Sequence, residues 1–148
     1  TYTGYSAICL AEGVREGGEL ITIDCNEELE EVANEYFVKS GYESVIKMMV
    51  GDALSIIPSL KNGFDLVFID ADKENYVHYY HQVFDKVNVG GYIIADNVLW
   101  SGKVVEEFQL GDKETQALMD FNSLVQQDNR VINMLLPFRD GLMILQKK

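Results

Sequence analysis

Two short apolar segments that each end in an acid most limit what this chain can fold into. Leu66 to Ile69 and Tyr92 to Ala95 carry no charge, and they stop at Asp70 and Asp96. A short apolar run that is bounded by turn residues and followed by a helical pattern is typical of a strand buried on both faces of a parallel sheet. Each acid then stands at the carboxyl end of its strand, the edge where ligands bind in open α/β sheets.

These strand ends predict a metal site. If the two strands are neighbours, their axes lie about 4.8 Å apart, and Asp70, Asp96 and the adjacent Asn97 present their oxygens to one point. Two carboxylates that close repel each other unless a cation lies between them. Oxygen-only ligands select a hard divalent ion such as Mg²⁺ or Ca²⁺. The alternative is that these residues only cap the helices that follow each strand.

The first residues of the chain have the pattern of a ligand-binding turn. Residues 1–6 hold a glycine and several hydroxyl side chains before an apolar helical pattern, and free N–H groups at a helix start can bind a ligand. A second strand, residues 19–24, ends at Asp24, where nucleotide-binding folds hold ribose hydroxyls. Alternatively, Asp24 or Asn26 caps the helix that follows.

The order of elements predicts one doubly wound α/β domain over residues 1–148, with a mostly parallel sheet and an antiparallel hairpin at one edge. The expected strands are residues 19–24, 45–50, 64–70, 92–96, 131–136 and 141–146, and the expected helices include residues 27–40, 55–60, 73–87 and 115–128. The stretch 100–113, with Trp100, Phe108 and Leu110, is expected to face a substrate. Because the chain opens in a turn, we expect its first strand and whatever preceded that strand to be missing.

Composition narrows the function. The net charge of −12 disfavours a nucleic-acid partner, which needs a basic surface. No apolar window approaches the roughly 18 residues of a membrane span and no leader opens the chain, so we expect no membrane partner and a cytoplasmic location. Cys9 and Cys25 lack zinc-site spacing and are expected to be buried free thiols.

With these residues in place, the chain closely resembles the class I S-adenosylmethionine-dependent methyltransferases. More narrowly, it resembles the cation-dependent O-methyltransferase family that includes the catechol and caffeoyl-CoA enzymes. The resemblance covers essentially the whole chain, with six segments in the family's order. These are TYTGYS, ITID, GDAL, FIDADKENY, DNVLW and LPFRDGLMI.

The resemblance assigns roles to individual positions. The metal ligands would be Asp70, Asp96 and Asn97, with Mg²⁺ first and Ca²⁺ or Mn²⁺ as alternatives. Lys73 would be the catalytic base beside Asp70, and Ser101 stands where plant relatives have a substrate-contacting asparagine. S-adenosylmethionine would contact Thr1, Tyr2, Ser6, Asp24, Ala53, Asp70 and Asp72. The resemblance also implies amino-terminal helices, missing from this chain, that would cover the substrate and form a homodimer in the full-length protein.

The chemistry that these roles imply is methyl transfer to a hydroxyl of a catechol-like or caffeoyl-type phenol. A phenol has a pKa near 10 and is a poor nucleophile until it is ionised. A divalent cation that ligates two vicinal oxygens stabilises the phenolate and orients it. Lys73 would stand near that charge and accept the phenol proton. Otherwise it is a first-turn helix residue that pairs with Glu74 or Asp72.

Three other functions stay open from the sequence. A relative with the same cofactor could methylate a hydroxylated uridine in transfer RNA, although the acidity of the chain counts against this. A nicotinamide-dependent dehydrogenase or a nucleotide-binding module would use similar glycine turns, but the full G-x-G-x-x-G pattern is absent from the sequence. The last alternative is a non-catalytic remnant, against which the three proposed metal ligands and the lysine speak.

Overall fold

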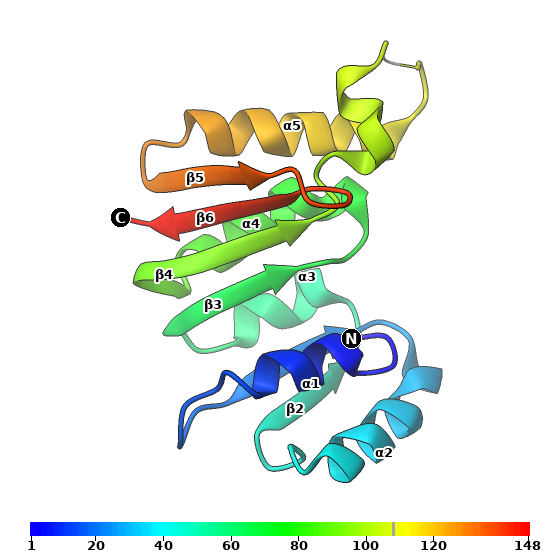
Figure 1. The fold of residues 1–148 in the computed structure, drawn as a ribbon, viewed down its shortest axis with the longest axis vertical. Helices are drawn as coiled ribbons and strands as arrows, with labels where there is room; N and C mark the ends of the chain where they lie inside the picture. Colours follow the sequence, from blue (N-terminus) through cyan, green and yellow to red (C-terminus); the bar gives the residue numbers. More distant parts are fainter. Residues whose placement is uncertain (108) are drawn as a thin grey trace. The chain divides into compact units, whose positions relative to one another are not determined.

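The structure is a computed structural model that describes residues 1–107 and 109–148 (Figure 1). The chain divides into two compact units, Thr1–Ser59 and Leu60–Lys148. Phe108, expected in the substrate-facing stretch, lies outside the described residues. The single domain over residues 1–148 stays a prediction.

A pair of parallel strands forms the centre of the first unit. They pair from Leu20 opposite Ile46 to Asp24 opposite Val50. The elements in chain order are α1 (Tyr5–Ala11), β1 (Leu20–Asp24), η1 (Glu27–Leu29), α2 (Glu30–Ser40), β2 (Ile46–Val50), α3 (Ala53–Ile56) and η2 (Ile57–Ser59). The carboxyl ends of β1 and β2 therefore lie at the same edge, next to the turn that opens the chain.

Small residues in and just before α1 leave room for the Phe37 ring of α2 in this unit. Its core contains Ala7 and Ala11 of α1 together with Phe37 of α2. Gly4 begins α1 with a φ of 87°, and a Cβ atom built on it would lie 2.7 Å from Phe37 Cε1. Only glycine fits both the backbone and the space, so the opening turn has a fixed position.

The second unit contains a four-stranded sheet in the order β3-β4-β6-β5. Its elements are β3 (Phe64–Ile69), η3 (Lys73–Asn75), α4 (Tyr76–Phe84), β4 (Val87–Asp96), η4 (Trp100–Val105), α5 (Lys113–Gln127), β5 (Val131–Leu136) and β6 (Leu142–Lys147). β3 and β4 are parallel, whereas β6 runs antiparallel to both β4 and β5. Figure 1 shows the β5–β6 turn at the edge where β3 and β4 end.

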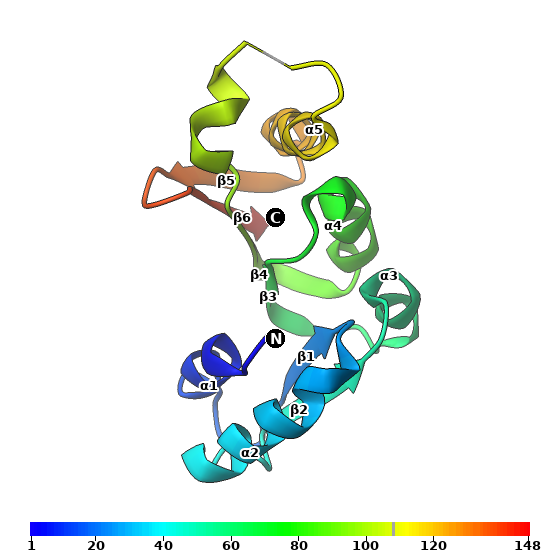
Figure 2. The same cartoon turned by 90° about the vertical axis from the view of Figure 1, so that its right-hand side faces the viewer.

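Helices α4 and α5 cover one face of this sheet (Figure 2). The core beneath them is aromatic, with Tyr76 and Tyr80 both edge-on to Phe121. These three side chains are fully buried. The opposite face leaves large apolar side chains partly exposed, namely Leu66, Phe68, Tyr92, Ile132 and Met134.

The predicted order of strands and helices is confirmed, including the reversed final strand. β4 begins at Val87 rather than at residue 92, because a register shift between Phe64 and Leu66 accommodates the two glycines inside the strand.

The prediction of buried thiols is wrong: both cysteines are exposed. Cys9 lies on the side of α1 away from buried Ala7 and Ala11, and Cys25 follows the last residue of β1. None of the helices described is long and apolar enough to span a membrane.

Phe121→Ala should lower the free energy of unfolding by about 3–5 kcal/mol, because it removes a buried ring and leaves a cavity beside two tyrosines. Urea denaturation of this variant and of Phe138→Ala provides the comparison, since Phe138 is 67% exposed. Equal losses in the two variants would contradict the packing described for α4 and α5.

Asp128, at the end of α5, should make stability depend on pH. Hydrogen bonds from Arg130, which outweigh the effect of burial, hold the pKa of this carboxyl well below its usual range. The folded pKa is depressed, so the stabilisation is present above the unfolded value of about 3.9 and is lost as the pH falls through the folded value.

Asp128→Asn should therefore destabilise the protein by about 1–3 kcal/mol at pH 7, and the difference from the unmodified protein should shrink below about pH 4. Unfolding curves between pH 7 and pH 3 measure it, with Asp120→Asn as the control on the same helix. A difference that stays constant over this range would refute the pH dependence.

Candidate functional site

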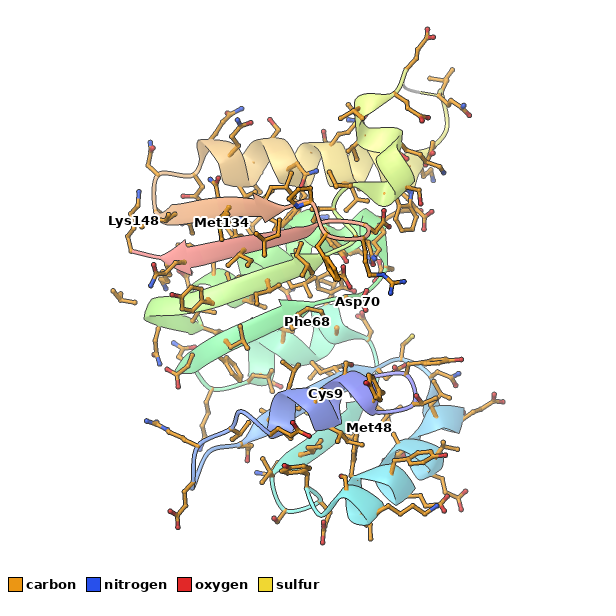
Figure 3. All side chains as sticks on the ribbon, viewed as in Figure 1. Cys9, Met48, Phe68, Asp70, Met134 and Lys148 are labelled. Atoms are coloured by element: carbon orange, nitrogen blue, oxygen red, sulfur yellow. The ribbon has the colours of Figure 1, made fainter. Side chains whose placement is uncertain are left out.

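The carboxyl ends of β3 and β4 bring the predicted acids together. Ile69 pairs with Ala95 in a parallel register, so Asp70 and Asp96 occupy the next position on adjacent strands. Figure 3 shows Asp70 at the end of β3. Asn97 follows with a φ of 59°, in the left-handed region that asparagine tolerates better than most residues. The two strands are therefore neighbours, which was the condition for the predicted metal site.

The Lys73 side chain joins the two strand ends. Its Nζ donates to Asn97 Oδ1 at 2.9 Å and to Asp70 Oδ1 at 3.3 Å. Lys73 begins η3 and is only 6% exposed, whereas the Asp70 side chain is 51% exposed, so a buried amine meets a carboxylate that solvent still reaches. The lysine therefore pairs with Asp70, not with the Glu74 or Asp72 of the alternative interpretation.

Tyr76 is a site residue that sequence reasoning missed. Its hydroxyl accepts a hydrogen bond from Lys73 Nζ at 2.6 Å and donates one to the Asp96 carbonyl oxygen at 2.9 Å. Burial, and then the negative charge of Asp70, raise the pKa of the Tyr76 hydroxyl. Tyr76 therefore stays a neutral hydroxyl at physiological pH. The sequence signal that could have identified Tyr76 is its spacing of three residues from Lys73, which places the two side chains on the same side of a helix.

Two of the three predicted metal ligands present oxygen atoms of the kind that a hard divalent cation prefers. Lys73 Nζ contacts oxygens of both Asp70 and Asn97, so two of the three predicted ligands lie within reach of a single cationic atom. Among the residues described, no group of three or more His, Cys, Asp or Glu side chains could hold a metal. The amide oxygen of Asn97 would thus be needed to complete the set, and a metal would compete with Lys73 for it.

An open cavity of about 720 Å³ adjoins the end of β4, and neither Asp70 nor Lys73 is among the residues that line it. Its size is in the range of small-molecule sites. The residues that line it are Asp96, Asn97, Ser101, Phe138, Arg139, Asp140 and Leu142. Ser101 is thus close to the predicted ligands. Sequence reasoning missed Phe138, Arg139 and Asp140, which the β5–β6 turn contributes.

The backbone after β4 is unusual. Trp100 and Ser101 have φ values of 49° and 55°, which place two consecutive non-glycine residues in the left-handed region. Each such residue costs roughly 1–2 kcal/mol, and strain of this kind concentrates at functional sites. The Trp100 ring lies 5.8 Å from Lys73 Nζ, so this segment forms part of the surroundings of the lysine.

Asp72 has partners within the chain. One of its carboxylate oxygens accepts a hydrogen bond from Tyr79, and the other accepts one from Asn75. These contacts tie the start of η3 to α4. Its expected contact with the cofactor stays a prediction.

The first unit gathers part of the predicted cofactor set around Asp24. This carboxylate accepts hydrogen bonds from the N–H groups of Tyr2 at 2.7 Å and Asn26 at 3.0 Å. Burial opposes ionisation of Asp24, but the hydrogen bonds from Asn26 and Tyr2, together with the positive charge of the Thr1 amino group, lower its pKa. Asn26 caps η1 through the Glu28 N–H, so the capping role falls to Asn26 and not to Asp24.

Three further predicted cofactor residues, Thr1, Ser6 and Ala53, belong to the same unit, whereas Asp70 and Asp72 belong to the second unit. The Thr1 hydroxyl is 2.6 Å from the Thr22 hydroxyl, which anchors the opening turn to β1. Ser6 is exposed in the first turn of α1, and Ala53 is the first residue of α3. Their contacts with a cofactor stay predictions.

Comparisons with known proteins agree with this architecture. Caffeoyl-CoA O-methyltransferase 5 from Nicotiana tabacum is 31% identical over 99% of this chain, which spans 65% of the length of that relative. The crystal structure of TomG, an O-methyltransferase from Streptomyces achromogenes in complex with SAM, is 26% identical with a TM-score of 0.94, over 100% of this chain and 70% of its own. The O-methyltransferase from Bacillus cereus in complex with SAH is 29% identical with a TM-score of 0.92, over 99% of this chain and 71% of its own.

A family model described as O-methyltransferase matches residues 1–148. The match includes both strand ends, the β5–β6 turn and the opening turn around Asp24. The chain therefore belongs to the O-methyltransferase family.

Proposed function

We propose that the whole protein transfers a methyl group from S-adenosylmethionine to a hydroxyl of a catechol-like or caffeoyl-type phenol, with a divalent cation at the ends of β3 and β4. Membership of the O-methyltransferase family supports the reaction class. The SAM and SAH complexes of similar structures support the donor, and the caffeoyl-CoA enzyme of Nicotiana tabacum supports a phenolic acceptor.

The meeting of Lys73 Nζ with oxygens of Asp70 and Asn97 carries this proposal. Activating a phenol requires a group that takes its proton and positive charge that stabilises the resulting phenolate. An amine beside oxygen atoms that could hold a cation would meet both requirements at one point. This arrangement has no corresponding use in hydride transfer, so a dehydrogenase is disfavoured.

Each residue of the site has a separate role. Asp70, Asp96 and Asn97 would hold the cation, with Mg²⁺ the first candidate and Mn²⁺ or Ca²⁺ the alternatives. The cation would supply positive charge beside two vicinal oxygens of the acceptor. Lys73 would accept the phenol proton at Nζ. Tyr76 positions Lys73 and cannot replace it as the base, because its raised pKa keeps the hydroxyl neutral and poorly acidic.

The reaction balances without a further reactant. The phenol oxygen attacks the methyl carbon of the sulfonium in line with the breaking carbon–sulfur bond. The oxygen–methyl bond forms, S-adenosylhomocysteine leaves as a neutral thioether, and Lys73 Nζ holds the phenol proton. Positioning of the acceptor oxygen and the methyl carbon is the main contribution that we expect from the protein.

Asp70→Ala and Asp96→Ala should each lower kcat by at least about 100-fold, because each removes a ligand that would hold the cation. Methyl transfer to 4-methylcatechol by the whole protein, with and without EDTA, measures the effect. Asp65→Ala is the matched control, since Asp65 lies near the start of β3 and is exposed. If EDTA and both substitutions left the rate unchanged, the metal mechanism would be wrong.

Asp24→Asn should weaken binding of S-adenosylhomocysteine about tenfold, because an amide is a weaker acceptor for ribose hydroxyls than a carboxylate. Calorimetric titration of the whole protein measures this, with Glu19→Gln just before β1 as the control. NAD should give no binding heat. Tight NAD binding without binding of S-adenosylhomocysteine would favour the nucleotide-binding alternative.

A further inference from the structure

We propose that Arg139 binds an anionic group of the methyl acceptor, a carboxylate or a phosphate, so that the preferred substrate is an acidic phenol and not a neutral catechol. This inference rests on the proposed function and concerns the part of the acceptor that lies away from the reacting hydroxyl. Nothing in the proposed chemistry itself requires Arg139.

The position of Arg139 is the first argument. It lines the same cavity as Asp96 and Asn97, the predicted ligands on β4. An acceptor whose hydroxyls reach those ligands would therefore extend along a wall that includes Arg139. Phe138, 67% exposed, lines the cavity beside it and offers an apolar surface for the aromatic ring of such a molecule.

The β5–β6 turn has a fixed position relative to the strand ends. Leu99 N–H donates to the Asp140 carbonyl at 2.9 Å, and Val98 N–H donates to the Gly141 carbonyl at 3.2 Å. Gly141 is so close to Leu99 that a Cβ atom on it would lie 2.5 Å from Leu99 Cγ. The backbone of Arg139 is thus held against the segment that directly follows Asp96 and Asn97.

The charge of Arg139 is available to a ligand. Its neighbour Asp140 uses its carboxylate to accept a hydrogen bond from the Ser101 N–H. In the same unit, Arg130 is neutralised by Asp128, whereas no ion pair of Arg139 occurs within residues 1–107 and 109–148. The chain has a net charge of −12, so the guanidinium of Arg139 supplies positive charge at this cavity within a chain that is acidic as a whole. Guanidinium groups bind carboxylates and phosphates through paired hydrogen bonds.

The backbone conformation gives a further argument. Arg139 has a φ of 51°, in the left-handed region that glycine adopts without steric cost. The backbone conformation at this position favours glycine, yet the residue here is an arginine, whose long cationic side chain lies at the cavity. Strain at a cavity wall is typical of residues that contact a ligand.

The test compares acceptors that differ only in charge. The probes are 3-(3,4-dihydroxyphenyl)propanoate, its neutral amide and 2-(3,4-dihydroxyphenyl)ethyl phosphate, because their saturated spacers insulate the ring electronically. The whole protein should use at least one anionic probe with a kcat/KM about tenfold above that of the amide, mainly through KM. The better anion identifies the group. Added salt should reduce the ratio of kcat/KM between the anionic probe and the amide, because salt screens the charge interaction.

Two variants remove the charge of Arg139, and two others act as controls. Arg139→Gln should abolish the preference, and so should Arg139→Gly, which also relieves the left-handed backbone and is not expected to fail through misfolding. Arg139→Lys should retain part of it. Lys148→Gln removes one positive charge at the other end of β6 (Figure 3) and should leave the preference unchanged.

The outcomes separate this inference from the proposed function. Methylation of the amide with no advantage for either anion would overturn the role of Arg139 while leaving the reaction intact. The same conclusion follows if the Arg139 variants raise KM for S-adenosylmethionine and leave the acceptor preference unchanged. Absence of methyl transfer to all three probes would contradict the proposed function itself.

Discussion

The parallel pairing of β3 with β4 is the constraint on which the site depends. Because Ile69 lies opposite Ala95, β3 and β4 end at the same level of the sheet. Asp70 and Asn97, which follow these strands, therefore both reach Lys73 Nζ. A shift of one residue would send Asp70 and Asp96 to different sides of the sheet, since successive side chains alternate between faces. Ile93 and Ala95 are fully buried on the core face of β4, and a shift of one residue would move them out of the core.

A buried network connects this register to the core of the unit. Tyr76 is bonded to Lys73 and to the backbone of Asp96, and its ring packs edge-on against Phe121 of α5. The same side chain thus belongs to the hydrophobic core and to the site. Substitutions in α5 can therefore affect the position of Lys73 without contacting any reacting atom.

Much of this arrangement could be predicted from the sequence, for physical reasons. The strands 64–70 and 92–96 are short, uncharged and sharply ended, so their type, their order and the place of Asp70, Asp96 and Asn97 followed from local pattern. Tyr76 could not be assigned in this way, because aromatic residues at helical spacing are usually core residues. Arg139 lies 43 residues after Asp96, and only the position of β6 beside β4 brings its turn to the strand end. Cys9 was predicted wrongly because burial depends on which side of α1 faces the core, and Cys25 because it lies just beyond the end of β1.

The convergence of three oxygens from two strand ends is the central claim, and anomalous diffraction from crystals of the whole protein soaked in Mn²⁺ tests it most directly. The account predicts one anomalous peak within about 2.5 Å of oxygens of Asp70, Asp96 and Asn97, with Lys73 Nζ no longer bonded to Asn97. A peak bound to other residues, or none at saturating Mn²⁺ while Lys73 keeps its bonds to Asp70 and Asn97, would contradict it.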